Sequence, residues 1–159
     1  MQLLSNELKA VAVMADMSEN GATVTRDQCM TVEHFNYRCA RKRDRDGRTY
    51  ESSEPVELTF QVRINGEDQA KPFYRQLCSG DEYGVLSFLF NTTFQSTGRL
   101  ASYEQAMAVE GFVVDVQEDF HSAALAETNE GQIALRARML VRSIIYVGQN
   151  SNKTLCFIH

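Results

Sequence analysis

One acidic side chain, Glu118, lies among apolar residues of a predicted strand and is the best candidate for acid–base chemistry. Alternation from Phe112 to Phe120 predicts that strand and places Glu118 on the same face as Val114 and Val116. A carboxyl group buried on an apolar face has a raised pKa and can act as a general acid. More often such a glutamate pairs with an arginine or lies at a barrel rim, and we expect that arrangement here.

The three histidines, His34, His121 and His159, form no motif typical of a metal site. No nucleophile elbow and no phosphate-binding loop is present either. We therefore expect no catalytic residues, no metal site and no cofactor, and a protein that is not an enzyme. An enzyme using Glu118 or His34 as acid or base is one alternative, and it requires a concave site with at least two titratable groups.

The four cysteines, Cys29, Cys39, Cys78 and Cys156, contain no C-x-x-C pair. We expect reduced thiols that serve as small apolar residues. A disulfide between Cys29 and Cys156 in an oxidising setting is the alternative.

The overall charge is mildly acidic, because 16 Lys and Arg residues face 21 Asp and Glu residues in a chain of 159 residues. Nucleic-acid-binding domains usually have a pI above about 9, so no nucleic-acid partner is expected. No apolar stretch approaches the roughly 20 residues needed to span a bilayer, and residues 1–7 lack a signal-peptide pattern. The sequence predicts one domain over residues 1–159, cytoplasmic assembly and no membrane insertion.

Alternation of apolar and polar residues is the main pattern of the chain, and it predicts antiparallel strands. It is without error from Val56 to Ile64, where every second residue is apolar. The other predicted strands are Leu8–Met14, Thr31–Cys39, Val85–Phe94, Phe112–Phe120 and Ile133–Ile144.

One helix is predicted over Asp68–Gly80, with Pro72 in its first turn. Its apolar residues recur at helical spacing and are expected to face the sheet. The predicted fold is mainly β: a small antiparallel barrel or sandwich with one short α-helix and a long charged loop between two strands. The residues expected on the buried helix face are Phe73, Tyr74, Leu77 and Cys78.

The charged loop runs from Ala40 to Pro55, and residues 41–48 hold five cations and two anions. Hairpin loops usually contain about 2–5 residues, so this length needs a reason. Asp46 and Gly47 predict a tight turn at the tip. Because each cation has an anion nearby, the loop suits a salt-bridged protein contact better than binding to phosphates.

The last two predicted strands carry charges that would face each other in an antiparallel pair. Such pairs are worth about 0.2–1 kcal/mol each. A solvated polar face is the simplest interpretation, and the lining of a lumen or a subunit contact is the alternative. The residues concerned are Asp115, Asp119, Arg136, Arg138 and Arg142.

The order of these features resembles the Hcp-like tube proteins of type VI secretion systems, especially the TssD branch of Bacteroidetes, over about residues 8–148. An aromatic strand with Phe35-Asn36-Tyr37 leads into the loop Asp44-Arg45-Asp46-Gly47-Arg48. Residues 112–120 and Ile133-Ala134-Leu135-Arg136-Ala137-Arg138 follow. The chain departs from the family at Thr49, where proline is common, and at Met139, where glutamate is common.

The resemblance implies a β-barrel that assembles into six-membered rings, which stack into a hollow tube. The implied partners are further copies of itself, the spike, sheath and baseplate proteins, and effector proteins in the lumen. It also implies export without a signal peptide, and residues 149–159 form a tail beyond the matching part. The residues expected in contacts between subunits are Arg43, Asp44, Arg45, Asp46, Gly47 and Arg48.

Two further interpretations remain beside the main tube subunit. An alternate tube subunit or a related phage-tail-like ring protein would share the fold and the assembly. A monomeric small barrel that carries an apolar ligand would instead enclose a cavity of several hundred Å³.

Overall fold

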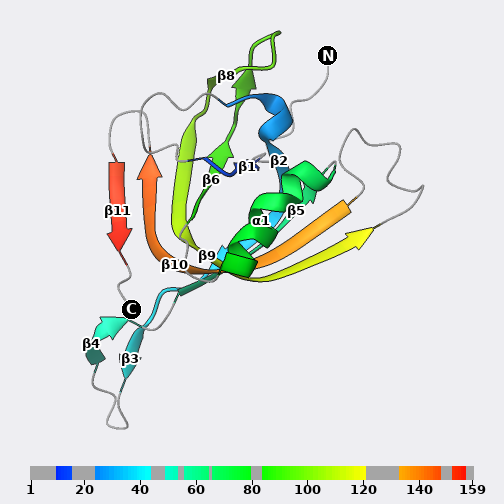
Figure 1. Ribbon diagram of the computed structural model, residues 1–159. Coiled ribbons are helices and arrows are strands. Elements are labelled where there is room, and N and C mark those ends of the chain that lie inside the picture. Colours follow the sequence, from blue (N-terminus) through cyan, green and yellow to red (C-terminus); the bar gives the residue numbers. More distant parts are fainter. Residues whose placement is uncertain are drawn as a thin grey trace.

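The alternating segments form a closed β-barrel in the computed structural model (Figure 1). The structure describes residues 10–15, 24–43, 49–53, 56–64, 66–79, 84–120, 133–147 and 152–156. All pairings between barrel strands are antiparallel, in the order β10-β5-β2-β1-β6-β9, and β9 pairs back onto β10. The barrel strands are β1 (Ala10–Val13), β2 (Met30–Tyr37), β5 (Val56–Ile64), β6 (Gly84–Phe90), β9 (Gln105–Phe120) and β10 (Ile133–Val147).

The remaining elements extend or cover this barrel. One α-helix, α1, spans Glu67–Ser79, and a short 3-10 helix spans Arg26–Gln28. Part of the segment predicted as a tail forms a strand that pairs with β10. The other strands are β3 (Arg41–Arg43), β4 (Thr49–Ser53), β7 (Thr93–Phe94), β8 (Leu100–Ser102) and β11 (Asn152–Cys156).

Strand β5 has the bounds that its alternation predicts. It lies between β2 and β10, so both of its edges are paired. Its five apolar residues are all 0% exposed, while its polar residues point outward. The prediction of a mainly β barrel with one helix is confirmed, and each predicted strand corresponds to a strand of the barrel.

Aromatic side chains fill the barrel interior. Phe60 of β5 lies 5.7 Å from Phe73 of α1 and 5.9 Å from Phe88 of β6, measured between ring centroids. All three side chains are fully buried. Phe35 of β2 stacks on Phe88. Tilted and edge-on aromatic pairs of this kind add to the stabilisation from burial. Helix α1 therefore closes over a packed core.

The prediction for the buried face of α1 is partly wrong. Phe73 is buried, but Tyr74 and Leu77 are 37% and 38% exposed, and Cys78 is exposed as well. The buried residues are Ala70, Phe73 and Gln76, which follow one narrow stripe at a spacing of three. Successive helix residues are about 100° apart around the axis, so residues one position beyond this stripe turn toward solvent.

Two β-bulges between β9 and β10 change which side chains face inward. The register shifts between Arg138 and Met139 and again between Val141 and Ser143. A bulge adds one residue to a strand and thereby reverses the alternation beyond it. The alternation predicts Val113 and Val116 on opposite faces of the strand. Because of the bulge, both face inward: Val113 is buried and Val116 packs against the core. Ile144, predicted on the arginine face, is likewise fully buried.

Strands β9 and β10 bend sharply together across the base of the barrel (Figure 1). Gly111 of β9 lies opposite Val141 of β10 in this pair of strands. A Cβ atom at Gly111 would lie 2.2 Å from the backbone oxygen of Leu140. Glycine therefore permits the close approach of the two backbones at this point.

Candidate functional site

Charged and amide side chains run across the outer surface of four neighbouring strands, β2, β5, β10 and β9. The strand alternation places them there, since the opposite residues fill the barrel. We call this set the charged face. Its members are Glu33, Glu57, Gln61, Arg63, Asp115, Arg136 and Arg138.

Arg138 links three strands of the charged face. Its Nη2 lies 3.0 Å from Oδ2 of Asp115 on β9, and its Nη1 lies 3.9 Å from Oε1 of Glu57 on β5. The pairing of Asp115 with Arg138 across antiparallel strands is the arrangement predicted from sequence. All three side chains are about half exposed.

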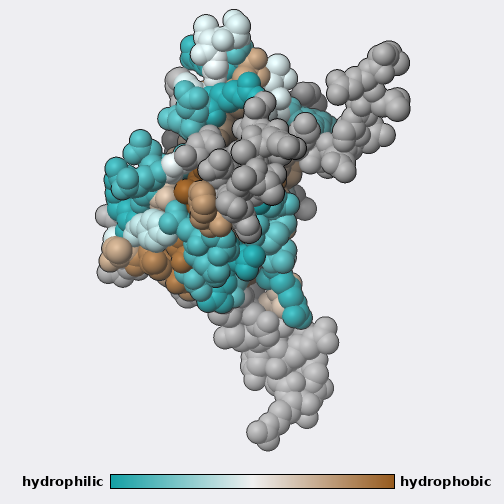
Figure 2. Space-filling model, turned by 90° about the vertical axis from the view of Figure 1, so that its right-hand side faces the viewer, coloured by the Kyte–Doolittle hydropathy of each residue, from teal (hydrophilic) through white to brown (hydrophobic). Residues whose placement is uncertain are grey.

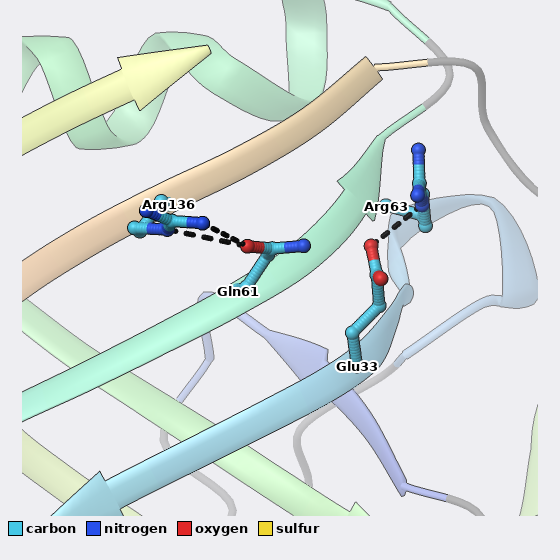
Figure 3. Close-up of polar contacts among 4 residues, drawn as sticks. All are labelled: Glu33, Gln61, Arg63 and Arg136. Carbon is cyan, nitrogen blue, oxygen red and sulfur yellow. Dashed lines mark hydrogen bonds and ion pairs between the residues drawn. The ribbon is translucent and has the colours of Figure 1, made fainter. Parts of the chain in front are cut away.

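Two further contacts connect β2, β5 and β10 (Figure 3). Arg136 donates from Nε and Nη2 to Oε1 of Gln61, at 3.2 and 2.9 Å. Arg63 and Glu33 form an ion pair at 2.5 Å, and the Arg63 side chain is only 11% exposed. Glu33, Gln61 and Arg63 were not predicted, although the polar positions of β5 signal its outward face.

The other predicted charges have separate partners. Arg142 lies at the second bulge, with its Nη1 3.6 Å from Oε1 of Glu110. Asp119 accepts a hydrogen bond from Gln117 at 3.4 Å and forms no described ion pair with an arginine. The five charges predicted as one group therefore form one close pair, Arg138 with Asp115, and three separate contacts.

The candidates for acid–base chemistry lie in solvent. Glu118 is exposed and accepts a hydrogen bond of 2.9 Å from the hydroxyl of Tyr74 on α1. The prediction that Glu118 has a partner holds, but the partner is a tyrosine rather than an arginine. Desolvation, followed by this hydrogen bond and the charge of Glu118, raises the pKa of Tyr74. His34 is also exposed, so neither residue has the buried environment that tunes a general acid.

Neither a metal cluster nor a membrane-spanning helix is found in the described residues. No group of three or more His, Cys, Asp or Glu side chains there is placed to hold a metal ion. No helix in this part of the chain is long and apolar enough to cross a membrane. Figure 2 shows mainly hydrophilic residues on the described part of one side, with smaller hydrophobic areas.

The predicted charged loop begins and ends as a two-stranded ribbon. Strands β3 and β4 pair antiparallel, with Arg41 opposite Ser53 and Arg43 opposite Thr49. This hairpin projects away from the barrel (Figure 1). Of the six residues predicted in subunit contacts, Arg43 lies in β3, and residues 44–48 lie outside the described part of the chain.

Cys29, Cys39 and Cys78 are free, as predicted, so Cys29 forms no disulfide with Cys156. Burial raises the pKa of the Cys29 thiol to about 11, whereas Cys78 is exposed. At pH 8 only about one Cys29 thiol in a thousand is then ionised, and the thiolate is the reactive form.

We expect iodoacetamide to label Cys29 at least tenfold more slowly than Cys78, as measured by peptide mass spectrometry. Equal rates in the folded protein would contradict this burial, and unfolding in urea should remove the difference.

The fold is similar to those of solved Hcp proteins and of a tail tube. A structure titled Hcp protein matches with a TM-score of 0.59 and 9% identity, over 96% of this chain and 99% of that one. Hcp1 from Flavobacterium johnsoniae matches with a TM-score of 0.54 and 13% identity, over 84% and 96%. The SPP1 tail tube matches with a TM-score of 0.51 and 7% identity, over 94% and 81%. No protein-family model and no curated protein matches the sequence, and at these identities the likeness shows the fold alone.

Proposed function

We propose that this protein is a structural subunit of a type VI secretion tube, which assembles into stacked rings through contacts between identical copies. The observation that carries the proposal is the closed barrel with a projecting hairpin, because this fold is shared along nearly the full chain with Hcp and phage tail-tube structures. The absence of sequence matches leaves an alternate tube subunit or a phage-type tube protein as variants of the same proposal.

The physical properties of the described surface suit a tube wall. A ring of identical subunits requires two different surfaces on each copy that fit each other head to tail. A hairpin that projects from its own barrel supplies one such surface. The packed aromatic interior makes each subunit a rigid unit, and the tilted pair of Phe60 and Phe73 holds α1 against the barrel.

The charged face is proposed to line the lumen. Its ion pairs are about half exposed, apart from the more buried pair between Arg63 and Glu33. Exposed pairs of this kind contribute only about 0–1 kcal/mol each, so stability alone does not account for them. Alternating positive and negative groups hold water and present no large apolar area to which a passing protein would adhere. Effector proteins are the proposed cargo, and spike, sheath and baseplate proteins are the proposed partners.

In the hairpin, we propose that Gly47 forms the tip and that the neighbouring charges contact the next subunit. The tube is proposed to assemble in the cytoplasm as six-membered rings and to leave the cell without a signal peptide. The contact residues are Arg43, Asp44, Arg45, Asp46 and Arg48.

The carrier interpretation is disfavoured by the barrel interior. Eight strands enclose a space that side chains just fill or that holds one small ligand, and six strands enclose less. Here the side chains of Phe60, Phe73 and Phe88 meet at the centre. A ligand cavity of several hundred Å³ would require these aromatic rings to move apart.

Replacement of residues 43–48 by a Gly-Ser segment of equal length tests the proposal. We expect wild-type protein to form annular particles of uniform diameter in electron microscopy. The variant should remain a folded monomer by circular dichroism and light scattering, because β3 and β4 form a sheet of their own and are no part of the barrel.

A matched control replaces the exposed turn residues 95–97 of the β7–β8 connection in the same way. This control should form rings. Wild-type protein that stays monomeric at high concentration would contradict the tube function. Rings that persist in the 43–48 variant would contradict the role of the hairpin alone.

A further inference from the structure

We propose that the outer edge of β11 is the acceptor for the hairpin of a neighbouring copy, and that β4 of that copy adds to this edge as an extra strand. The proposal rests on the proposed ring assembly and specifies the second surface that a head-to-tail contact requires. Main-chain hydrogen bonds provide the affinity in strand addition, so strand pairing and backbone placement determine where it can occur.

The acceptor edge exists because β10 pairs with two different strands along one of its sides. One edge of β10 pairs with β9 over almost its whole length. The other edge pairs first with β5, over Ile133–Val141, and then with β11, over Ser143–Val147. Among the described strands, β11 pairs with β10 alone, so its second edge has no strand partner in the described part of the chain. Such an edge is a template for another strand.

The donor is the two-stranded ribbon of β3 and β4. Among the described strands, β3 and β4 pair only with each other. An isolated two-stranded hairpin is at best marginally stable in water, and a third strand is needed for stability. The ribbon also points away from its own barrel (Figure 1), so a surface of another copy is the place where it can gain that strand.

The two edges match in length and chemistry. Strands β4 and β11 contain five residues each. Each contains one charged residue, and the charges of Glu51 and Lys153 are opposite. Thr49-Tyr50 and Thr154-Leu155 include residues that favour extended backbone. Strand β3 contains only three residues, all cationic, and is the poorer donor.

A complementation experiment with two variants tests this contact. Variant A replaces residues 49–53 by a Gly-Ser segment, so it keeps the acceptor and loses the donor. Variant B ends at residue 151, so it keeps the donor and loses the acceptor, while the six barrel strands remain complete. We expect each variant alone to be monomeric and an equimolar mixture to form A–B dimers and no rings, by light scattering.

The outcomes separate this contact from the tube function. Wild-type protein without rings would contradict the proposed function. Wild-type rings together with rings of variant B would overturn only the strand addition. A mixture of folded A and B that stays monomeric would also overturn it.

Disulfide trapping provides a second measurement if variant B does not fold. Single cysteines are introduced at each position from Thr49 to Ser53, and Cys156 in β11 is the natural partner. Residues directly opposite in neighbouring strands have Cα atoms about 4.5–5.5 Å apart, which suits a disulfide. At least one position should give oxidised dimers in wild-type-like rings, and Cys156→Ser should abolish them. No dimers at any position would overturn the proposal.

Discussion

Phe60→Ala is expected to lower the free energy of unfolding by about 3–5 kcal/mol. The side chain is fully buried and contacts aromatic rings from both α1 and β6, so its removal leaves a cavity that neither neighbour can fill. Domains of this size are stable by about 5–15 kcal/mol in total, so the variant should lose a large share of that stability. Urea denaturation followed by circular dichroism measures the change.

Phe120→Ala is the matched control for this substitution, since Phe120 is 68% exposed. It should change the free energy of unfolding by no more than about 0.5 kcal/mol. A loss below 1 kcal/mol for Phe60→Ala would mean that the barrel centre is not packed as described. It would also restore the carrier interpretation, because a loosely filled barrel can accept a ligand.

Gly111→Ala should lower the free energy of unfolding by about 3 kcal/mol. This value is at the upper end of the typical cost of placing an extra group in a packed site. The new Cβ would lie 2.2 Å from the backbone oxygen of Leu140. That oxygen cannot move aside easily, because Leu140 is paired with Phe112 on one side and Glu57 on the other. Differential scanning calorimetry should show a lower melting temperature.

Gly66→Ala provides the control, because a Cβ at Gly66 meets nothing within 4 Å. Its melting temperature should stay close to that of wild type. A Gly111→Ala protein as stable as the Gly66→Ala protein would show that the backbones of β9 and β10 do not approach so closely at Gly111.

Periodicity predicted individual strands better than it predicted the faces of long ones. Strand β5 is regular and paired on both edges, so its alternation maps directly onto inside and outside. Strands β9 and β10 contain bulges that reverse the alternation, and the residues at Val113 and Ile144 carry no sequence signal of that reversal. The helix face was missed for a related reason, since only one narrow stripe of α1 touches the barrel.

Contacts of the charged face could be predicted where the two paired strands follow each other along the chain. They could not be predicted where the hairpin separates the two strands. Asp115 and Arg138 lie on neighbouring strands of the chain, so antiparallel pairing brings them to one face. The contact between Glu33 and Arg63 depends on the register of β2 against β5, which contains a bulge between Val32 and His34. The sequence between β2 and β5 is the hairpin itself, and its length does not fix that register.

The position of β10 between β5 and β9 determines when the barrel can form during synthesis. Strand β5 ends at residue 64 and its partner β10 begins at residue 133, so the long segment 65–132 separates these paired strands. Pairing across such separations is slow and leaves strand edges open in the meantime. A nascent chain that has reached Phe120 has every barrel strand but one. We therefore expect its open strand edges to favour association with other nascent chains until β10 is complete.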